Sequence, residues 1–316
     1  VDAETGSNIR FLGALVSNNG MIKTLGGTIL FNNSIDNTGT LYSAAGTMNS
    51  YHLTNTGTID GGGGQFWIQN YWSNAAGTFT ASTGTVRYVL TSTANAPTNV
   101  VYNNLLVELN TLNLAEDALV GGTFTIASGA VAAGTHHLDV MGLATVAGSG
   151  TLSSTNGLLL LRGEVIVGGT VQTTGTGGLI AQAGLTNTGS IQLAASSTFV
   201  GAVVNSAGVI QNTGVTGTQM LFIGNVTNTA SGVLSNTSSG EIVCHSSVES
   251  HGVVNAGSGT ILFEASYENS GDLCLGNGTV TSSQDLVDPG NVHGDVGTLV
   301  LLKNWSDTGG TTDPAS

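Results

Sequence analysis

Charged side chains are scarce in this sequence, and positively charged ones are the scarcest. The 316 residues include five Lys and Arg against nineteen Asp and Glu, which gives a formal net charge of −14. Charged residues make up 8% of the chain, whereas soluble proteins usually contain about a quarter. Nucleic acids and anionic membrane surfaces are bound chiefly through Lys and Arg. The composition therefore predicts no nucleic-acid partner and no attachment to an anionic membrane surface.

Long apolar runs are lacking as well. No stretch approaches the roughly eighteen consecutive apolar residues of a membrane-spanning helix, so membrane insertion is not expected. The sequence begins at Val1 rather than at Met, and it is rich in Ser, Thr, Asn and Gly. These features predict a processed, secreted product whose leader has been removed and which lies outside the cell or on its surface.

What the sequence has in abundance is glycine, with 48 residues, and one short motif that keeps returning. The core of the motif is Asn55-Thr56-Gly57-Thr58-Ile59, and related copies occupy 35–41, 185–191 and 267–273. We call the glycine of each copy the marker glycine. The marker glycines are Gly20, Gly39, Gly57, Gly77, Gly129, Gly150, Gly169, Gly189, Gly208, Gly232, Gly252 and Gly271. They are 18 to 24 residues apart except for one gap of 52 residues, and such a period predicts stacked copies of one small unit.

Apolar residues recur at fixed distances from the marker glycines. Two residues after each one stands a large apolar residue: Ile22, Leu41, Ile59, Phe79, Val131, Leu152, Val171, Ile191, Ile210, Leu234, Val254 and Leu273. Four residues before, a looser column contains Val16, Ile35, Leu53, Val146, Val165, Leu185, Val204, Val248 and Tyr267. Mostly polar or small residues flank the first column, as in a strand with one buried face. A third apolar segment follows Gly-Thr turns, as at 27–31 and 217–222.

Three short strands and three turns in about twenty residues form one coil of a β-solenoid. The sequence therefore predicts an all-β, single-stranded parallel β-helix of about 13 to 15 coils. Glycine and asparagine are expected at its corners because corners often need positive φ. Asn18, Asn37, Asn55, Asn187 and Asn269 are expected to form side-chain ladders. A second ladder is expected on the outer face from Gln172, Gln192 and Gln211.

The period also suggests how the chain is divided. Residues 1–17 form a strand or an imperfect first coil, and residues 18–280 form the solenoid. Within it, residues 83–125 break the phase and suggest wider coils with a projecting loop near Thr91–Asn99. Residues 281–316 are expected to form a strand and a tail. The two cysteines, Cys244 and Cys274, are 30 residues apart and hence out of phase by half a coil. Two free thiols are expected, with a disulfide as the alternative if the coils between them are irregular.

Two stretches carry a family resemblance. WSNAAGTFTASTGTVRY at 72–88 and YNNLLVELNTLNLAEDALVGGTFTIASGAV at 102–131 resemble the Gly/Thr/Asn-rich repeats of secreted bacterial β-helix surface proteins of the adhesin and fibre type. The resemblance implies a solenoid architecture and a place on the cell surface. It implies no particular ligand, because one fold serves many functions.

Candidate catalytic groups are thinly spread. A polysaccharide lyase would need clustered cations, and the five Lys and Arg are scattered. A glycosidase needs two carboxylates that face one groove, for which Glu264 with Glu268 and Asp285 with Asp288 are the available pairs. A metal site from Cys244, His245 and His251 lacks tight ligand spacing. The sequence predicts a protein that is not an enzyme, without catalytic residues, cofactor or metal.

One aromatic concentration stands out, QFWIQNYW at 65–72. If Phe66 and Ile68 point inward, Trp67 points outward, and Tyr71 or Trp72 could join it. These three residues are the candidates for contact with a glycan or another subunit, and covering a corner is the alternative role.

The function expected first is structural. Neither end of the sequence shows a helix or a lysine-rich edge that would prevent further stacking. We therefore expect a subunit that joins copies of itself end to end in an extracellular filament, fibre or sheath. The alternative is a rod-like adhesin that binds surface glycans through the three aromatic residues and the 91–99 loop. A polysaccharide-degrading β-helix enzyme is the third possibility.

Overall fold

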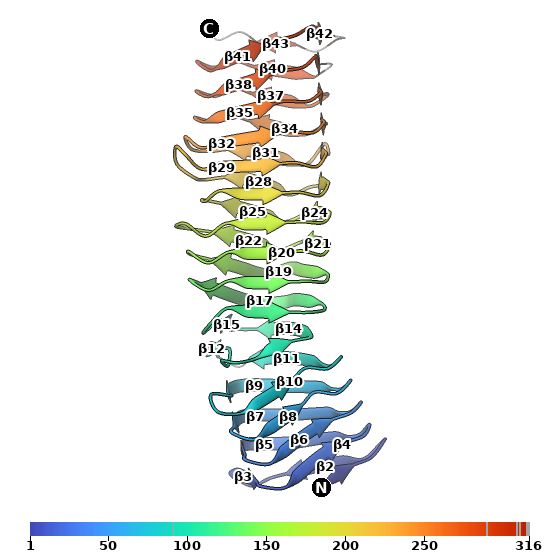
Figure 1. Cartoon of the computed structure of the whole chain (residues 1–316). Coiled ribbons are helices and arrows are strands. Elements are labelled where there is room, and N and C mark those ends of the chain that lie inside the picture. The colour runs from blue at the N-terminus through green and yellow to red at the C-terminus, as the bar shows by residue number, and fades with distance from the viewer. Residues whose placement is uncertain (91, 289, 308, 310, 314–316) are drawn as a thin grey trace. The chain divides into compact units, whose positions relative to one another are not determined.

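The chain forms a parallel β-solenoid, as the sequence predicts (Figure 1). It has about 16 turns of about 19 residues, slightly more and slightly shorter turns than the 13 to 15 coils of about twenty residues that the sequence predicts. The structure is a computed structural model, and it describes residues 1–90, 92–288, 290–307, 309 and 311–313. Within these ranges every regular element is a strand, and no helix is long and apolar enough to cross a membrane. The contacts divide the chain into two compact units. Unit 1 is Val1–Thr145 with Gly150–Leu152, and unit 2 is Val146–Ser149 with Ser153–Ser316.

In unit 1, the long strands β5, β7 and β9 bend in the middle and so contribute to two faces of a turn. The short strands β1, β4, β6, β8 and β10 form a third face as a five-stranded parallel sheet. The strands of unit 1 are β1 (Asp2–Ala3), β2 (Asn8–Phe11), β3 (Leu15–Asn18), β4 (Met21–Thr24), β5 (Thr28–Asn37), β6 (Thr40–Ser43), β7 (Thr47–Asn55), β8 (Thr58–Asp60), β9 (Gln65–Ser73), β10 (Thr78–Thr80), β11 (Thr85–Leu90), β12 (Ala94–Asn95), β13 (Val101–Tyr102), β14 (Asn104–Leu109), β15 (Thr111–Asn113), β16 (Ala118–Val120), β17 (Phe124–Gly134) and β18 (Leu138–Val140).

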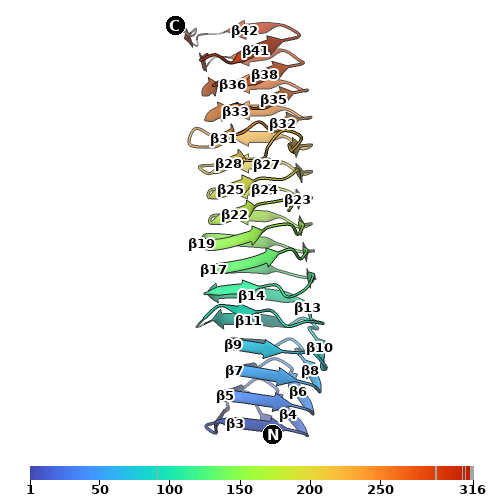
Figure 2. The same ribbon diagram turned by 90° about the vertical axis from the view of Figure 1, so that its left-hand side faces the viewer.

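In unit 2, each turn consists of three separate short strands, and each strand pairs in parallel with its equivalents in the turns before and after (Figure 2). The boundary strand is β19 (Ala144–Ser154). The others are β20 (Leu159–Leu161), β21 (Val165–Val167), β22 (Thr170–Thr173), β23 (Leu179–Ala181), β24 (Leu185–Asn187), β25 (Ser190–Leu193), β26 (Ser197–Phe199), β27 (Val203–Asn205), β28 (Val209–Asn212), β29 (Gln219–Phe222), β30 (Val226–Asn228), β31 (Val233–Asn236), β32 (Glu241–Cys244), β33 (Val248–Ser250), β34 (Val253–Asn255), β35 (Thr260–Phe263), β36 (Tyr267–Asn269), β37 (Asp272–Cys274), β38 (Thr279–Ser282), β39 (Leu286–Asp288), β40 (Asn291–His293), β41 (Thr298–Leu301), β42 (Trp305–Asp307) and β43 (Thr312–Asp313).

The residues two positions after the marker glycines form the core, as predicted. Eleven of the twelve are at most 4% exposed, and Phe79 is half-buried. Ile191 and Ile210 show the register, since they face each other in adjacent turns. Neighbouring strands in a sheet lie about 4.8 Å apart, so each inward side chain is covered by the equivalent ones above and below. The hydrophobic effect therefore acts between turns rather than within one.

The second predicted column is wrong at Val204. Its side chain points to solvent, and Val203 takes the buried position instead. The cause is one extra corner residue, because Asn205 precedes its marker glycine by three residues where Asn187 precedes Gly189 by two. Counting back from the asparagine instead of the glycine finds the inward residue in both turns.

The predicted asparagine ladder is present, and it lies inside the solenoid. In unit 1 each side-chain amide donates to the side-chain oxygen of the next turn: Asn18 to Asn37 at 2.7 Å, Asn37 to Asn55 at 2.7 Å and Asn55 to Asn74 at 2.6 Å. All four residues are buried. A buried amide is tolerated only when it is hydrogen-bonded, and here each rung satisfies its neighbours.

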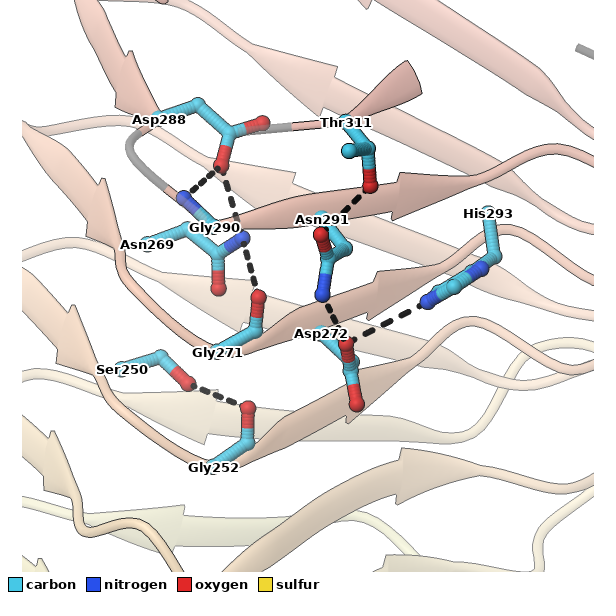
Figure 3. A network of polar contacts seen from close by, with 10 residues as sticks. All are labelled: Ser250, Gly252, Asn269, Gly271, Asp272, Asp288, Gly290, Asn291, His293 and Thr311. Atoms are coloured by element: carbon cyan, nitrogen blue, oxygen red, sulfur yellow. Dashed lines mark hydrogen bonds and ion pairs between the residues drawn. The ribbon is translucent and has the colours of Figure 1, made fainter. Parts of the chain in front are cut away.

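A second ladder runs through unit 2 with one imperfect rung. Asn187 donates to Asn205 at 2.8 Å, Asn205 to Asn228 at 2.9 Å, and Asn228 to the Ser250 hydroxyl at 3.1 Å. Beyond Ser250, the Asn269 amide donates to the Asp288 carboxylate at 2.9 Å (Figure 3). The predicted outer glutamine ladder is not found, because Gln192 and Gln211 donate to the hydroxyls of Ser190 and Thr237.

The marker glycines are required for a different reason from the one predicted. Gly39, Gly57 and Gly189 do not have positive φ, although Gly129 does. A Cβ at Gly57 would overlap the carbonyl oxygen of Gly39, and one at Gly189 would overlap that of Gly169. The corner brings the backbones of successive turns too close for any side chain. Glycine is therefore selected here by contact distance, and not by its conformational freedom.

Two of the predicted segments differ from the structure. The loop at Thr91–Asn99 does not project: β12 lies within it, and Ala94, Ala96 and Pro97 are buried; Thr91 itself lies outside the described residues. Of the segment 281–316, expected as a strand and a tail, the described residues continue the solenoid as β39 to β43; residues 289, 308, 310 and 314–316 lie outside the described residues. The overlooked signal is Gly290, which follows Gly271 by 19 residues.

Candidate functional site

An outward corner of unit 1 gathers aromatic and amide side chains. It lies where β5, β7 and β9 bend, and Ser34, His52 and Tyr71 face one another there in successive turns. The strand register shifts at this bend, between Phe31 and Ser34 and again between Ser50 and His52. Such irregularities place extra residues on the outside of a strand, and here they expose rings and amides.

The rings at this corner contact one another. Tyr51 and His52 are stacked with centroids 4.7 Å apart, and Tyr71 meets His52 edge-on at 6.2 Å. The Asn70 amide lies 2.9 Å from His52 Nε2, and the Ser92 hydroxyl donates to Asn70 Oδ1 at 2.8 Å. We call Tyr51, His52, Asn70, Tyr71 and Ser92 the Tyr71 corner. Its rings are held in place by neighbours, while 47% of Tyr71 remains accessible.

A shallow pocket adjoins the Tyr71 corner. It has a volume of about 180 Å³, and its lining includes Tyr71, Ser73, Asn95, Pro97 and Thr98. The 91–99 segment thus lies beside Tyr71, as the binding hypothesis requires, although it lies against the solenoid instead of projecting from it. An aromatic ring beside amides and hydroxyls is a surface on which a sugar can stack and form hydrogen bonds.

Trp67 points outward as predicted, but one face of its ring is occupied. The guanidinium carbon of Arg87 lies 4.2 Å from the ring centroid, in a cation–π arrangement. Arg87 Nε in turn donates to Glu108 at 2.7 Å, and the Trp67 indole N–H donates to Gln65 at 2.7 Å. Trp67 is half-buried. Arg87 covers one face of its ring and Gln65 accepts from its N–H group.

Trp72 is buried rather than exposed, which corrects the prediction, although it is among the residues that line the pocket beside Tyr71. It is 2% exposed, and its ring packs edge-on against Phe79 at 5.1 Å. The reason is again the corner spacing: Trp72 stands two residues before the ladder residue Asn74, at the position where Leu53 precedes Asn55. The side chain of Trp72 therefore points into the core of this turn, and that of its neighbour Tyr71 points outward.

The two carboxylate pairs considered as glycosidase candidates do not face one groove. Glu264 lies just after β35, where its carboxylate contacts the His245 ring. Glu268 lies in the middle of the next strand, β36, so the two carboxylates do not share one continuous strand face. Asp288 is buried in the asparagine ladder, where it also accepts from the Gly290 N–H at 3.1 Å (Figure 3). Asp285 accepts instead from Asn304 at the surface.

The three residues considered as metal-ligand candidates, Cys244, His245 and His251, do not converge on one point. Cys244 lies in the core, where burial raises the pKa of its thiol. His251 Nε2 lies 2.8 Å from Glu249, and its Nδ1 contacts the Ser270 hydroxyl. Within the part of the chain that the structure describes, no three His, Cys, Asp or Glu side chains are placed to hold a metal ion.

The expectation of two free thiols is confirmed. The pKa of the Cys274 thiol is raised by its partial burial and by the nearby Asp272 and Asp295 carboxylates. A raised pKa keeps a thiol protonated and a poor nucleophile.

Three residues of the Tyr71 corner, Tyr51, His52 and Asn70, were missed from the sequence. The available signal was the period, since His52 precedes Tyr71 by 19 residues and so lies beneath it in the previous turn. Comparison of the chain with family models, curated proteins and solved structures gave no match.

Proposed function

We propose that this protein is a structural subunit that joins copies of itself end to end through the open edges of its solenoid. The observation that carries the proposal is the edge of unit 1 formed by β1, β2 and β3. Each of these strands pairs on one side, with β4 or β5, and has no partner strand on the other among the described residues.

This edge also exposes apolar side chains. Leu12, Leu15, Met21 and Leu25 are all accessible to solvent, Leu12 to 69%. An edge strand offers a row of free backbone N–H and C=O groups, and isolated edges are normally covered or protected by charge. Apolar side chains beside free backbone groups instead favour another layer of strands.

A second edge, in unit 2, has matching properties. β41, β42 and β43 pair with β38, β39 and β40, and no further strand follows them in the described residues. Leu302 and Trp305 are exposed beside this edge. Since all pairings are parallel, this edge can meet the β1–β3 edge of a second copy without reversing a strand. A head-to-tail contact that does not close generates a filament.

The composition and the resemblance to secreted surface proteins support an extracellular place for such a filament. The alternative to a second copy is a further stretch of polypeptide that stacks on the same edges. The experiment must distinguish these two possibilities.

The test is assembly of the purified chain, followed by light scattering and negative-stain electron microscopy over a range of concentrations. We expect filaments whose number grows with concentration. Leu15→Lys places a charge on the β3 edge and should abolish them, because lysine blocks edge pairing. Val215→Lys, on an exposed loop of unit 2, is the matched control and should leave assembly unchanged. Monomers at every concentration, or filaments insensitive to Leu15→Lys, would refute the proposal.

A second candidate function is glycan binding at the Tyr71 corner, favoured by the accessible Tyr71 ring beside the 180 Å³ pocket. Base or sugar stacking on one aromatic side chain is worth about 1–3 kcal/mol. Tyr71→Ala should therefore weaken glycan binding by about tenfold or more on an array, whereas Tyr42→Ala, on β6, should not. Binding that is equal in both variants would exclude the Tyr71 corner.

A further inference from the structure

One sheet face of unit 2 carries a rank of outward positions at which five of the six side chains are aliphatic. Each of the six neighbouring strands β20, β23, β26, β29, β32 and β35 turns one central residue away from the core. In register, these residues are Leu160, Ile180, Thr198, Leu221, Val243 and Leu262. Outward positions on a solvated sheet are usually polar, as in the column of Gln172, Gln192 and Gln211 on β22, β25 and β28. The rank departs from that pattern.

Most side chains of the rank are partly accessible to solvent, and two further apolar side chains extend the rank on one side. Its members are half-buried, apart from Val243, which its neighbours cover. Val200 and Ile223, two residues after Thr198 and Leu221, are each 41% exposed. We call the six rank residues together with Val200 and Ile223 the aliphatic face. An apolar patch of this extent on a soluble chain commonly marks an interaction site.

The charges at the two ends of the aliphatic face are opposite in sign. Arg162 follows the rank residue of β20 by two positions, and Glu264 follows the rank residue of β35 by two positions. They are separated by five strand spacings, or about 24 Å, so they do not contact each other within one chain.

We propose that the aliphatic face pairs with the same face of a second copy, about a two-fold axis that runs along the strands between β26 and β29. This axis preserves the position along each strand and reverses the order of the strands. Arg162 then faces Glu264 of the second copy, and Val200 faces Ile223. Along the rank, Leu160 faces Leu262 and Ile180 faces Val243. A two-fold contact must be self-complementary. The face meets this requirement at its aliphatic pairs and at the Arg162–Glu264 pair, while Thr198 faces Leu221 at the centre and Glu264 also contacts His245 of its own chain.

The size of the face predicts a weak, reversible dimer. Six strands cover about 29 Å, and three outward positions across each strand cover about 20 Å. The dimer would therefore bury roughly 1,100–1,200 Å² in total, near the lower limit for specific interfaces. This lateral contact is independent of the end-to-end contact, because it uses the side of unit 2 and not an edge.

The test is a charge exchange followed by sedimentation equilibrium. Arg162→Glu or Glu264→Arg alone places like charges opposite each other twice in the dimer, and each should weaken it by about tenfold or more. The double variant restores opposite charges and should recover affinity to within a few fold. Only a contact between two copies can produce this recovery, since the residues are far apart in one chain. Glu268→Arg, on β36 outside the face, is the matched control and should leave the affinity unchanged.

Two results would overturn the proposal. One is a chain that shows no lateral dimer at any concentration, and the other is a double variant no better than the weaker single one. Leu15→Lys keeps the two proposals apart, because it should remove filaments while the dimer of the aliphatic face persists.

Discussion

Replacing Ser250 by Asn should stabilise the protein by completing the second asparagine ladder. Ser250 occupies the ladder position between Asn228 and Asn269. Its hydroxyl accepts from Asn228 but is too short to reach Asn269, and its own donation goes to the Gly252 carbonyl at a long 3.5 Å. As a result, Asn269 Oδ1 is buried without a hydrogen-bond partner (Figure 3).

The expected gain follows from the hydrogen bonds that change. A buried acceptor without a partner costs about 1–3 kcal/mol, and a typical net hydrogen bond contributes about 1 kcal/mol. Ser250→Asn keeps the bond from Asn228 and adds a donor to Asn269, at the rung spacing that other turns show. Ordering the longer side chain opposes this by up to about 1 kcal/mol. The net result should be a stabilisation of about 1 kcal/mol.

The assay is the denaturant midpoint of the full chain, with circular dichroism as the probe. Repeat proteins can unfold in parts, so the comparison is made between variants under one condition. Ser250→Ala is the control: it removes the acceptor for Asn228 and should lower the midpoint. A Ser250→Asn midpoint equal to or below the wild-type value would show that Asn269 Oδ1 is not limiting stability and would refute the reasoning.

Three further predictions concern other parts of the same architecture. Asn37→Ala should lower the free energy of unfolding by about 2–4 kcal/mol in denaturant titrations, because it breaks two rungs and leaves their partners unsatisfied; a loss below 1 kcal/mol would contradict it. Gly189→Ala should destabilise strongly through its overlap with the preceding turn, whereas Gly20→Ala, with open space at its Cβ, should not; equal midpoints would refute the contact argument. Hydrogen bonds from Asn291 and His293 lower the pKa of Asp272, so its contribution is present above about pH 4 and is lost as the pH falls through the folded pKa. Asp272→Asn should therefore reduce the difference in unfolding free energy between pH 5 and pH 2.5, and an unchanged difference would exclude this role.

The repeat, the parallel stacking and the first core column could be predicted from the sequence because each depends on a local period. The ladder asparagines were found for the same reason. The error came from counting positions from the marker glycine. The inward residue lies at a constant distance from the corner asparagine, whereas the number of residues between that asparagine and the glycine varies. Trp72 and Val204 were both misplaced by this single extra residue. A corner insertion leaves stacking intact, and the sequence alone does not show which side of the insertion stays in phase.

The candidate site was harder to predict, because it depends on what lies in neighbouring turns. That Arg87 covers Trp67 follows only from the pairing of β9 with β11. The clustering of Tyr51 and His52 depends on the register shift at the bend of β7. The rank of the aliphatic face was likewise hidden, since its members stand in segments whose inward residues are also apolar, and alternation between two apolar residues leaves no pattern to read.

The gap of 52 residues between Gly77 and Gly129 has a geometric explanation rather than being a simple irregularity. In the first turns the marker motif lies between two strands, as Gly57 lies between β7 and β8, whereas Gly129 lies within β17. The motif has moved to another corner of the triangle. Each turn has three corners, so a motif that shifts back by one corner recurs after a whole number of turns plus two-thirds of a turn. The gap of 52 residues is about 2.7 turns of 19 residues, which fits two full turns plus two-thirds. The strands β9, β11, β14 and β17 nevertheless pair in unbroken parallel register. Stacking is therefore maintained by the inward aliphatic and aromatic side chains, while the ladder is an addition that a corner can gain or lose.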